Sequence, residues 1–168
     1  MTKERFIELV WQEQEPLRRF LLSLCKGDSF TADDLAQEAL PKDCVSFNKF
    51  EGKSKFSTWL FRIAYNCWCD FYRKYGNSGE QLHTGRESEH INFQDISSLP
   101  DSKFLHQELY LALDKLSGTE KAVILLFYME EKSIKEIEQI MEIPSATIRS
   151  HLFRGRAHLK AFLENKKL

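Results

Sequence analysis

Basic and aromatic side chains recur along residues 133–163, which read SIKEIEQIMEIPSATIRSHLFRGRAHLKAFL. Six basic residues stand against one acidic residue from position 143 to the end, whereas residues 114–142 carry four Lys against seven acidic residues. Arginine side chains at helical spacing can bind phosphates and the edges of guanine bases. The stretch therefore predicts a surface for duplex DNA, with these contact residues: Thr147, Arg149, Ser150, Phe153, Arg154 and Arg156.

Two short helices and a tight turn must position these side chains. Ser133 and Glu136 have the spacing of a capping box, and an apolar stripe follows them. Pro144 ends that first helix, and Ser145 is placed to cap a second helix that begins at about Ala146. The inward face of the second helix comprises Ile148, Leu152, Gly155 and Leu159, and its glycine permits close approach of a neighbouring helix. A basic helix alone is commonly just solvated, but cap, turn and spacing together favour a helix-turn-helix on DNA.

A second basic stretch, FNKFEGKSKFSTWLFRIAYN, interleaves Lys and Arg with aromatic residues. Cations follow a phosphate backbone and aromatic faces stack on unpaired bases, so the mixture suits single-stranded nucleic acid. Helical spacing assigns seven residues of the segment that follows, aromatic ones among them, to the core, namely Trp59, Leu60, Ile63, Ala64, Cys67, Trp68 and Phe71. The polar loop at residues 51–55 differs from them and could hold an extruded base.

An acidic patch precedes this loop and consists of Asp33, Asp34, Gln37 and Glu38. It would repel nucleic acid and attract a basic protein surface. Pro41 follows closely, and because proline removes a helical amide, we expect the helix to kink or restart just after Leu40.

The whole chain of 168 residues has a formal net charge of −1, which argues against a general nucleic-acid coat. No apolar run approaches the length of a membrane span, and the charged start MTKERFIELVWQEQE does not resemble a signal peptide, so we expect a cytoplasmic protein without membrane insertion. Cys25, Cys44, Cys67 and Cys69 lack CxxC spacing, so we expect packing residues and no metal site. We also see no catalytic constellation and expect neither a cofactor nor an enzyme activity.

Helical periodicity is lost between residues 76 and 101, where the chain is rich in Gly, Ser and charge. No segment has convincing strand alternation. We therefore predict an all-α fold with two small helical domains, at residues 1–75 and 103–168, joined by a flexible acidic linker at residues 76–102.

Several of these motifs together resemble regions 2 and 4 of extracytoplasmic-function sigma factors of the bacterial sigma-70 family. The resemblance rests on ADDLAQE, on FNKFEGKSKFSTWLFRIAYN with DFYRK, on LSGTEKAVILLFY and on SATIRSHLFRGRAHL. It implies a subunit that joins the RNA polymerase core, directs it to promoters and helps to melt the DNA. An anti-sigma factor is a further partner of this kind of protein.

The resemblance also implies roles for individual positions. Asp34, Gln37 and Glu38 stand where the family contacts the clamp of the largest polymerase subunit, and the acidic half of the second module resembles the face that docks on the flap of the second-largest subunit. Lys53, Ser54, Lys55 and Phe56 stand in the loop that resembles the pocket for a flipped base of the minus-ten strand, with Arg62, Asn66 and Arg73 on the adjoining helix. Arg149, Ser150, Phe153 and Arg154 match positions that meet the minus-thirty-five duplex.

Two alternatives stay open from the sequence. A conventional helix-turn-helix regulator would bind duplex DNA without core polymerase and would prefer a palindrome. A thiol-based redox enzyme would use Cys67 and Cys69, although their spacing is not that of a redox pair.

Overall fold

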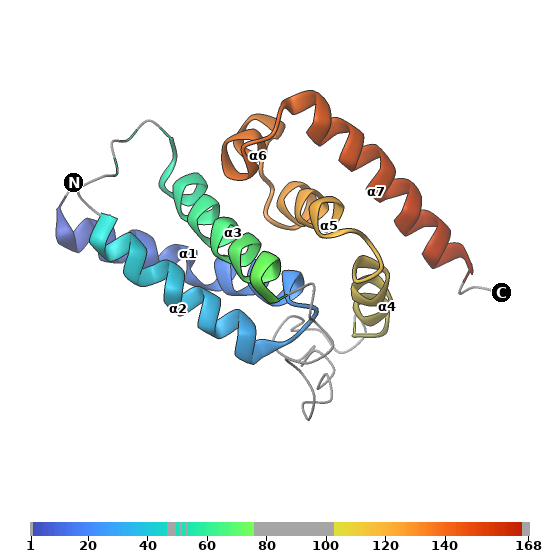
Figure 1. Ribbon diagram of the computed structural model, residues 1–168, viewed down its shortest axis with the longest axis horizontal. Helices are drawn as coiled ribbons and strands as arrows, with labels where there is room; N and C mark the ends of the chain where they lie inside the picture. The colour runs from blue at the N-terminus through green and yellow to red at the C-terminus, as the bar shows by residue number, and fades with distance from the viewer. Residues whose placement is uncertain (1, 47–49, 51, 53, 76–102, 166–168) are drawn as a thin grey trace.

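The computed structural model describes residues 2–46, 50, 52, 54–75 and 103–165 (Figure 1). These residues form helices, turns and short loops, and no strand occurs among them, which confirms the all-α class. The predicted linker at residues 76–102 and the predicted contact residue Lys53 lie outside the described residues.

The first module consists of α1 (Lys3–Leu24), α2 (Ser29–Ser46) and α3 (Phe56–Tyr75), which pack against one another. Phe20 and Phe61 meet in its centre with ring centroids 5.3 Å apart. Of the expected kink or restart just after Leu40, the restart is wrong, because α2 runs on through Pro41 as one helix. Proline costs one amide hydrogen bond, and the buried positions just before it, Leu35 and Ala39, anchor this helix in the core.

The second module contains α4 (Lys103–Leu113), α5 (Gly118–Ile124), a π-helical turn η5 (Leu125–Met129), α6 (Ile134–Met141) and α7 (Ser145–Asn165). The side chain of Ser117 caps α5 by accepting from the amide of Glu120. In a capping box the carboxylate of Glu120 would bond back to the amide of Ser117. Here it pairs with Nδ1 of His158 on α7, at 3.1 Å. This pair ties α5 to α7.

The two modules are joined by a continuous hydrophobic core that runs from α1 to α7. Helix α6 packs against α3, and α5 and α6 lie between α3 and α7 (Figure 1). The approach is close at Gly118, where a Cβ atom would lie 2.6 Å from Cη2 of Trp68. No helix in the described part of the chain is long and apolar enough to span a bilayer.

Candidate nucleic-acid interface

Helix α7 turns its predicted contact residues outward and its apolar stripe inward. Five of the six contact residues are exposed, namely Arg149, Ser150, Phe153, Arg154 and Arg156, whereas Thr147 is half-buried. The ring of Phe153 is 70% exposed, which is unusual for so large an apolar group. The outer face therefore offers guanidinium groups beside one aromatic ring.

Local sequence signals position this face. Ser133 and Glu136 form the predicted capping box at the start of α6, with hydrogen bonds of 3.1 and 3.3 Å in the two directions. Glu142 ends α6 in the left-handed conformation with φ 56°, and α7 begins at Ser145, one residue earlier than predicted, so Ser145 lies within the helix. At Gly155 a Cβ atom would lie 2.9 Å from Cγ1 of Ile124, which confirms the predicted close approach of a neighbouring helix.

Neighbouring groups determine the hydrogen bonding of two polar residues on this face, His151 and Ser150. Arg154 Nη2 lies 3.4 Å from His151 Nδ1, and burial together with the charge of Arg154 lowers the pKa of His151 below its ordinary value. His151 is therefore neutral at pH 7, and its ring nitrogen can accept from Arg154. The hydroxyl of Ser150 donates to the carbonyl of Ala146 at 3.1 Å, so its lone pairs rather than its proton face a ligand.

Tyr128 belongs to the same surface, although we did not predict it. Its hydroxyl accepts from Nη1 of Arg156 at 3.2 Å, and its side chain is half-exposed. Tyr128 lies in η5, where the wider helical turn changes the direction of successive side chains. Read with the period of a regular helix, the sequence LLFYM does not predict that Tyr128 faces this surface.

The predicted strand-binding loop places its residues in two different environments. Ser54 is half-buried and Lys55 is exposed beside the start of α3. Phe56 is 7% exposed and meets Phe6 and Phe50 edge to face, with centroids 5.5 and 5.7 Å away. Phe56 is thus a core residue in this conformation, and its predicted role in binding the minus-ten strand stays a prediction.

Three further predicted contact residues lie along α3. Arg62, Asn66 and Arg73 are four and seven residues apart, a spacing that places them on one side of the helix. Arg62 is half-buried, the other two are exposed, and Arg73 lies 3.9 Å from Asp70. The opposite side of α3 carries the buried residues Leu60, Phe61 and Ala64.

The acidic patch lies on α2. Asp34, Gln37 and Glu38 are exposed, whereas Asp33 accepts from Nε of Arg18 at 3.2 Å. Asp33 is thus engaged within the module, and the outer patch consists of the other three residues.

Thiol chemistry gains no support from the described cysteines. Cys67 is buried, and burial raises the pKa of Cys25 to about 12 and raises that of Cys69. A thiol rather than a thiolate is a poor nucleophile. No group of three potential metal ligands occurs in the described part of the chain.

Two family models match different parts of the chain. The family described as "Sigma-70 region 2" matches residues 9–77, and "Sigma-70, region 4" matches residues 106–159. The ECF RNA polymerase sigma factor SigW of Bacillus subtilis is 32% identical over 151 residues, covering 83% of this chain and 79% of the relative. SigM of the same organism is 31% identical, covering 85% of each chain.

A solved structure extends the similarity to three dimensions. The sigma factor RpoE, in complex with the anti-sigma factor NepR from Bartonella quintana, matches with a TM-score of 0.80 and 28% identity. The match covers 96% of this chain and 98% of that one. It therefore includes both helical modules.

Proposed function

We infer the function from a family assignment: this chain belongs to the extracytoplasmic-function (ECF) RNA polymerase sigma factors. A sigma factor binds the RNA polymerase core and directs it to promoters, and that is the function of this protein. The observation that carries this conclusion is the presence of regions 2 and 4 in one chain, in that order. A regulator that acts without core polymerase is not favoured, because it has no use for region 2.

The protein accordingly has RNA polymerase core, promoter DNA and an anti-sigma factor as partners. We assign core and minus-ten binding to residues 1–75, a linker to residues 76–102 and minus-thirty-five binding to residues 103–168. We propose a cytoplasmic location, which these partners support. Sigma factors supply specificity and no bond-breaking chemistry, so we assign no enzyme activity.

Within the second module, we propose that the outer face of α7 binds the minus-thirty-five duplex. Arg149 and Arg154 would address base edges or phosphates, and Arg156 would bind a phosphate with its guanidinium held by Tyr128. The exposure of all three guanidinium groups supports this assignment.

Within the first module, we propose that Lys53, Ser54 and Lys55 hold the melted minus-ten strand and that Arg62, Asn66 and Arg73 contact DNA just upstream. Capture of unpaired bases stabilises the open strand rather than forcing it open. Asp34, Gln37 and Glu38 would bind the polymerase clamp, and the acidic half of the second module would dock on the flap.

Transcription of genomic fragments by purified core polymerase, with the start sites mapped, tests the function. We expect defined starts only when this protein is added. The variant Asp34→Lys with Glu38→Lys should abolish capture by core, because reversed charges repel a basic clamp surface. The pair Glu4→Lys with Glu15→Lys, which changes two exposed acids on α1, is the matched control.

Each outcome has a separate meaning. Absence of any defined start with the wild-type protein would contradict the assigned function. Normal co-purification of the Asp34, Glu38 variant with core would contradict only the clamp assignment.

A further inference from the structure

One tyrosine outside α7 lies beside the proposed DNA-reading face. Tyr128 follows Ile124 by four residues, and in a regular α-helix the two side chains would share one face. Ile124 is buried against Gly155 of α7, whereas Tyr128 is 50% exposed. The difference arises in η5, where the amide of Glu130 donates to the carbonyl of Leu125 at 3.0 Å, five residues back. This wider turn rotates Tyr128 toward solvent, and such turns are frequent at functional sites.

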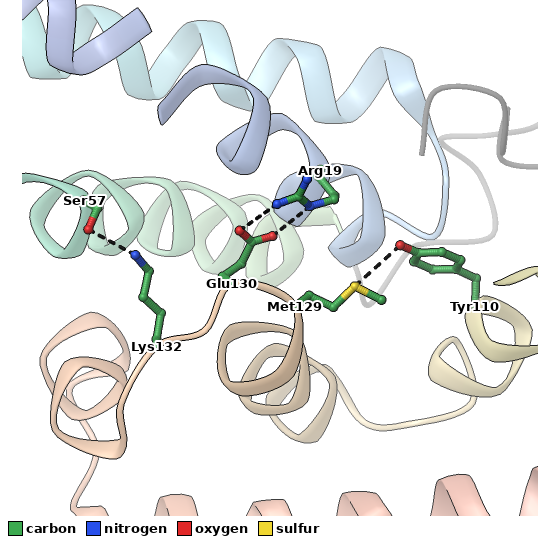
Figure 2. A network of polar contacts seen from close by, with 6 residues as sticks. All are labelled: Arg19, Ser57, Tyr110, Met129, Glu130 and Lys132. Carbon is green, nitrogen blue, oxygen red and sulfur yellow. Dashed lines mark hydrogen bonds and ion pairs between the residues drawn. The ribbon is translucent and has the colours of Figure 1, made fainter. Parts of the chain in front are cut away.

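The residues that follow Tyr128 attach η5 to helices other than α7. Sδ of Met129 accepts from the hydroxyl of Tyr110 on α4 at 3.7 Å (Figure 2). Glu130 turns to α1, where Nε and Nη2 of Arg19 donate to its two carboxylate oxygens at 3.1 and 3.0 Å (Figure 2). The contact with Tyr110 lies within the second module and therefore does not require the first. These contacts hold the end of η5, from which Tyr128 reaches α7.

Tyr128 and Arg156 form a pair of hydrogen-bond donors on the surface. Nη1 of Arg156 donates to the hydroxyl oxygen of Tyr128 at 3.2 Å, and both side chains are exposed. Because the tyrosine oxygen accepts from the guanidinium, its own O–H is left to donate to a third group. The guanidinium keeps further N–H donors and a permanent positive charge. The Tyr128 ring packs edge to face on Phe127, with centroids 5.0 Å apart, and this contact holds the hydroxyl in place.

The pair lies along one edge of the outer face of α7. Arg156 follows Arg149 by seven residues, which places both on the side of α7 that meets η5. Ser150 and Phe153 lie further round the exposed face. In a helix-turn-helix complex the reading helix lies in the major groove, and the elements beside it meet the sugar–phosphate backbone. The Tyr128–Arg156 pair is therefore placed for a phosphate rather than for a base edge.

We propose that Tyr128 is a DNA-binding residue, which together with Arg156 forms a phosphate subsite at the edge of the upstream promoter element. The tyrosine hydroxyl donates to one oxygen of a backbone phosphate, and the guanidinium of Arg156 binds a second oxygen. The subsite fixes the register of α7 in the groove and reads no sequence. This inference rests on the proposed binding of the minus-thirty-five duplex by α7, and it adds a contact from outside that helix.

Hydroxyl-radical footprinting of holoenzyme, assembled from core polymerase and the full chain, tests the subsite on a mapped promoter. Tyr128→Phe removes only the hydroxyl and keeps the ring that packs on Phe127. We expect this variant to bind about fivefold more weakly, equivalent to about 1 kcal/mol. It should lose protection at one backbone position that flanks the upstream element. No charge is lost, so the salt dependence of binding should stay unchanged, whereas Arg156→Ala should reduce its slope by about one.

A promoter in which single phosphates of the upstream element are replaced by neutral methylphosphonates locates the contact. At one position the replacement should weaken binding of the wild-type holoenzyme and should weaken binding of the Tyr128→Phe holoenzyme clearly less. Absence of any such position, or unchanged affinity of the Tyr128 variant, would overturn the proposal.

Two further variants separate a direct contact from an indirect one. Tyr72→Phe makes the same chemical change at a tyrosine of α3 that is 57% exposed, and it should leave the flanking position protected. Equal loss of this protection in the control would overturn the assignment to Tyr128. In an Arg156→Ala background, Tyr128→Phe should weaken binding further, because the tyrosine contacts the phosphate itself. No further loss would show that Tyr128 acts only by holding Arg156, which contradicts a direct contact.

Mapped transcription start sites report the proposed function separately. Loss of the phosphate subsite lowers promoter occupancy and leaves the positions of the start sites unchanged. Start sites without the expected change in the footprint of the Tyr128 variant would overturn the subsite and leave the assigned function standing.

Discussion

Side chains on α7 divide into two groups with different tasks. Ile148 and Leu152 are buried and fix the helix to its module, whereas Arg149 and Arg154 reach solvent. Phe153 leaves a large apolar ring in water, and the methyl group of thymine is a suitable apolar partner in the major groove. The exposed group is therefore suited to reading base edges and the buried group to positioning.

Substitution of Arg154 by Ala should weaken binding of the upstream promoter element by about 1–3 kcal/mol, because one guanidinium contact is lost. Lys160→Ala removes one positive charge from an exposed position further along the same helix and is the control. Footprinting of the holoenzyme measures the effect. Unchanged upstream protection in the Arg154 variant would remove this residue from the reading surface.

Single residues differed in how well the sequence predicted them. The outward-facing positions of α7 could be predicted because helical spacing separates them from the buried stripe. The burial of Phe56 could not be predicted, since an aromatic residue at the edge of a loop can turn to solvent or to the core. Its ring turns to the core because Phe6 and Phe50 lie beside it. Tyr128 depends on a π-helical turn, for which the sequence has no periodic signal.

At the scale of helices, the helix-turn-helix depends on how closely α7 approaches α5. Gly155 permits this approach, because an added Cβ atom would lie 2.9 and 3.1 Å from Cγ1 and Cδ1 of Ile124. Ile124 is itself buried and has little room to move. The glycine therefore sets the distance between the reading helix and its support.

Gly155→Ala should lower the free energy of unfolding by about 1 kcal/mol. Alanine favours the helix by about 1 kcal/mol, but overpacking a filled core costs about 1–3 kcal/mol. Urea unfolding measures the difference, and Lys160→Ala, at an exposed position of α7, should change stability by less than about 0.5 kcal/mol. A more stable Gly155 variant would contradict the close packing.

Helix boundaries in the second module follow from local chemistry. The capping box at Ser133 and the break before Pro144 act between neighbouring residues, and both were predictable. The restart predicted at Pro41 was wrong, because helix breaking by proline is a tendency that burial of the flanking turn can outweigh.

At the scale of the whole molecule, the two modules are not independent bodies in this structure. They share a hydrophobic core, and the Arg19–Glu130 pair joins residues 111 positions apart in the sequence. Such contacts leave no periodic pattern, so the sequence predicted two domains and not their packing. Closure covers Thr58 and engages Lys55, which links the arrangement of the modules to the proposed strand-binding loop.

We propose that the protein grips a promoter at two separate points, with α7 on duplex DNA and the start of α3 on a melted strand. Hydroxyl-radical footprinting and permanganate reactivity, measured on the same holoenzyme and promoter, report the two contacts separately. The wild-type protein should give upstream protection together with reactive thymines near the start site.

Two variants should divide these signals. Arg154→Ala should reduce the upstream protection, whereas Lys55→Ala should reduce permanganate reactivity and leave upstream protection in place. Upstream protection without any reactive thymine in the wild type, or equal loss of both signals in both variants, would contradict the two-point grip.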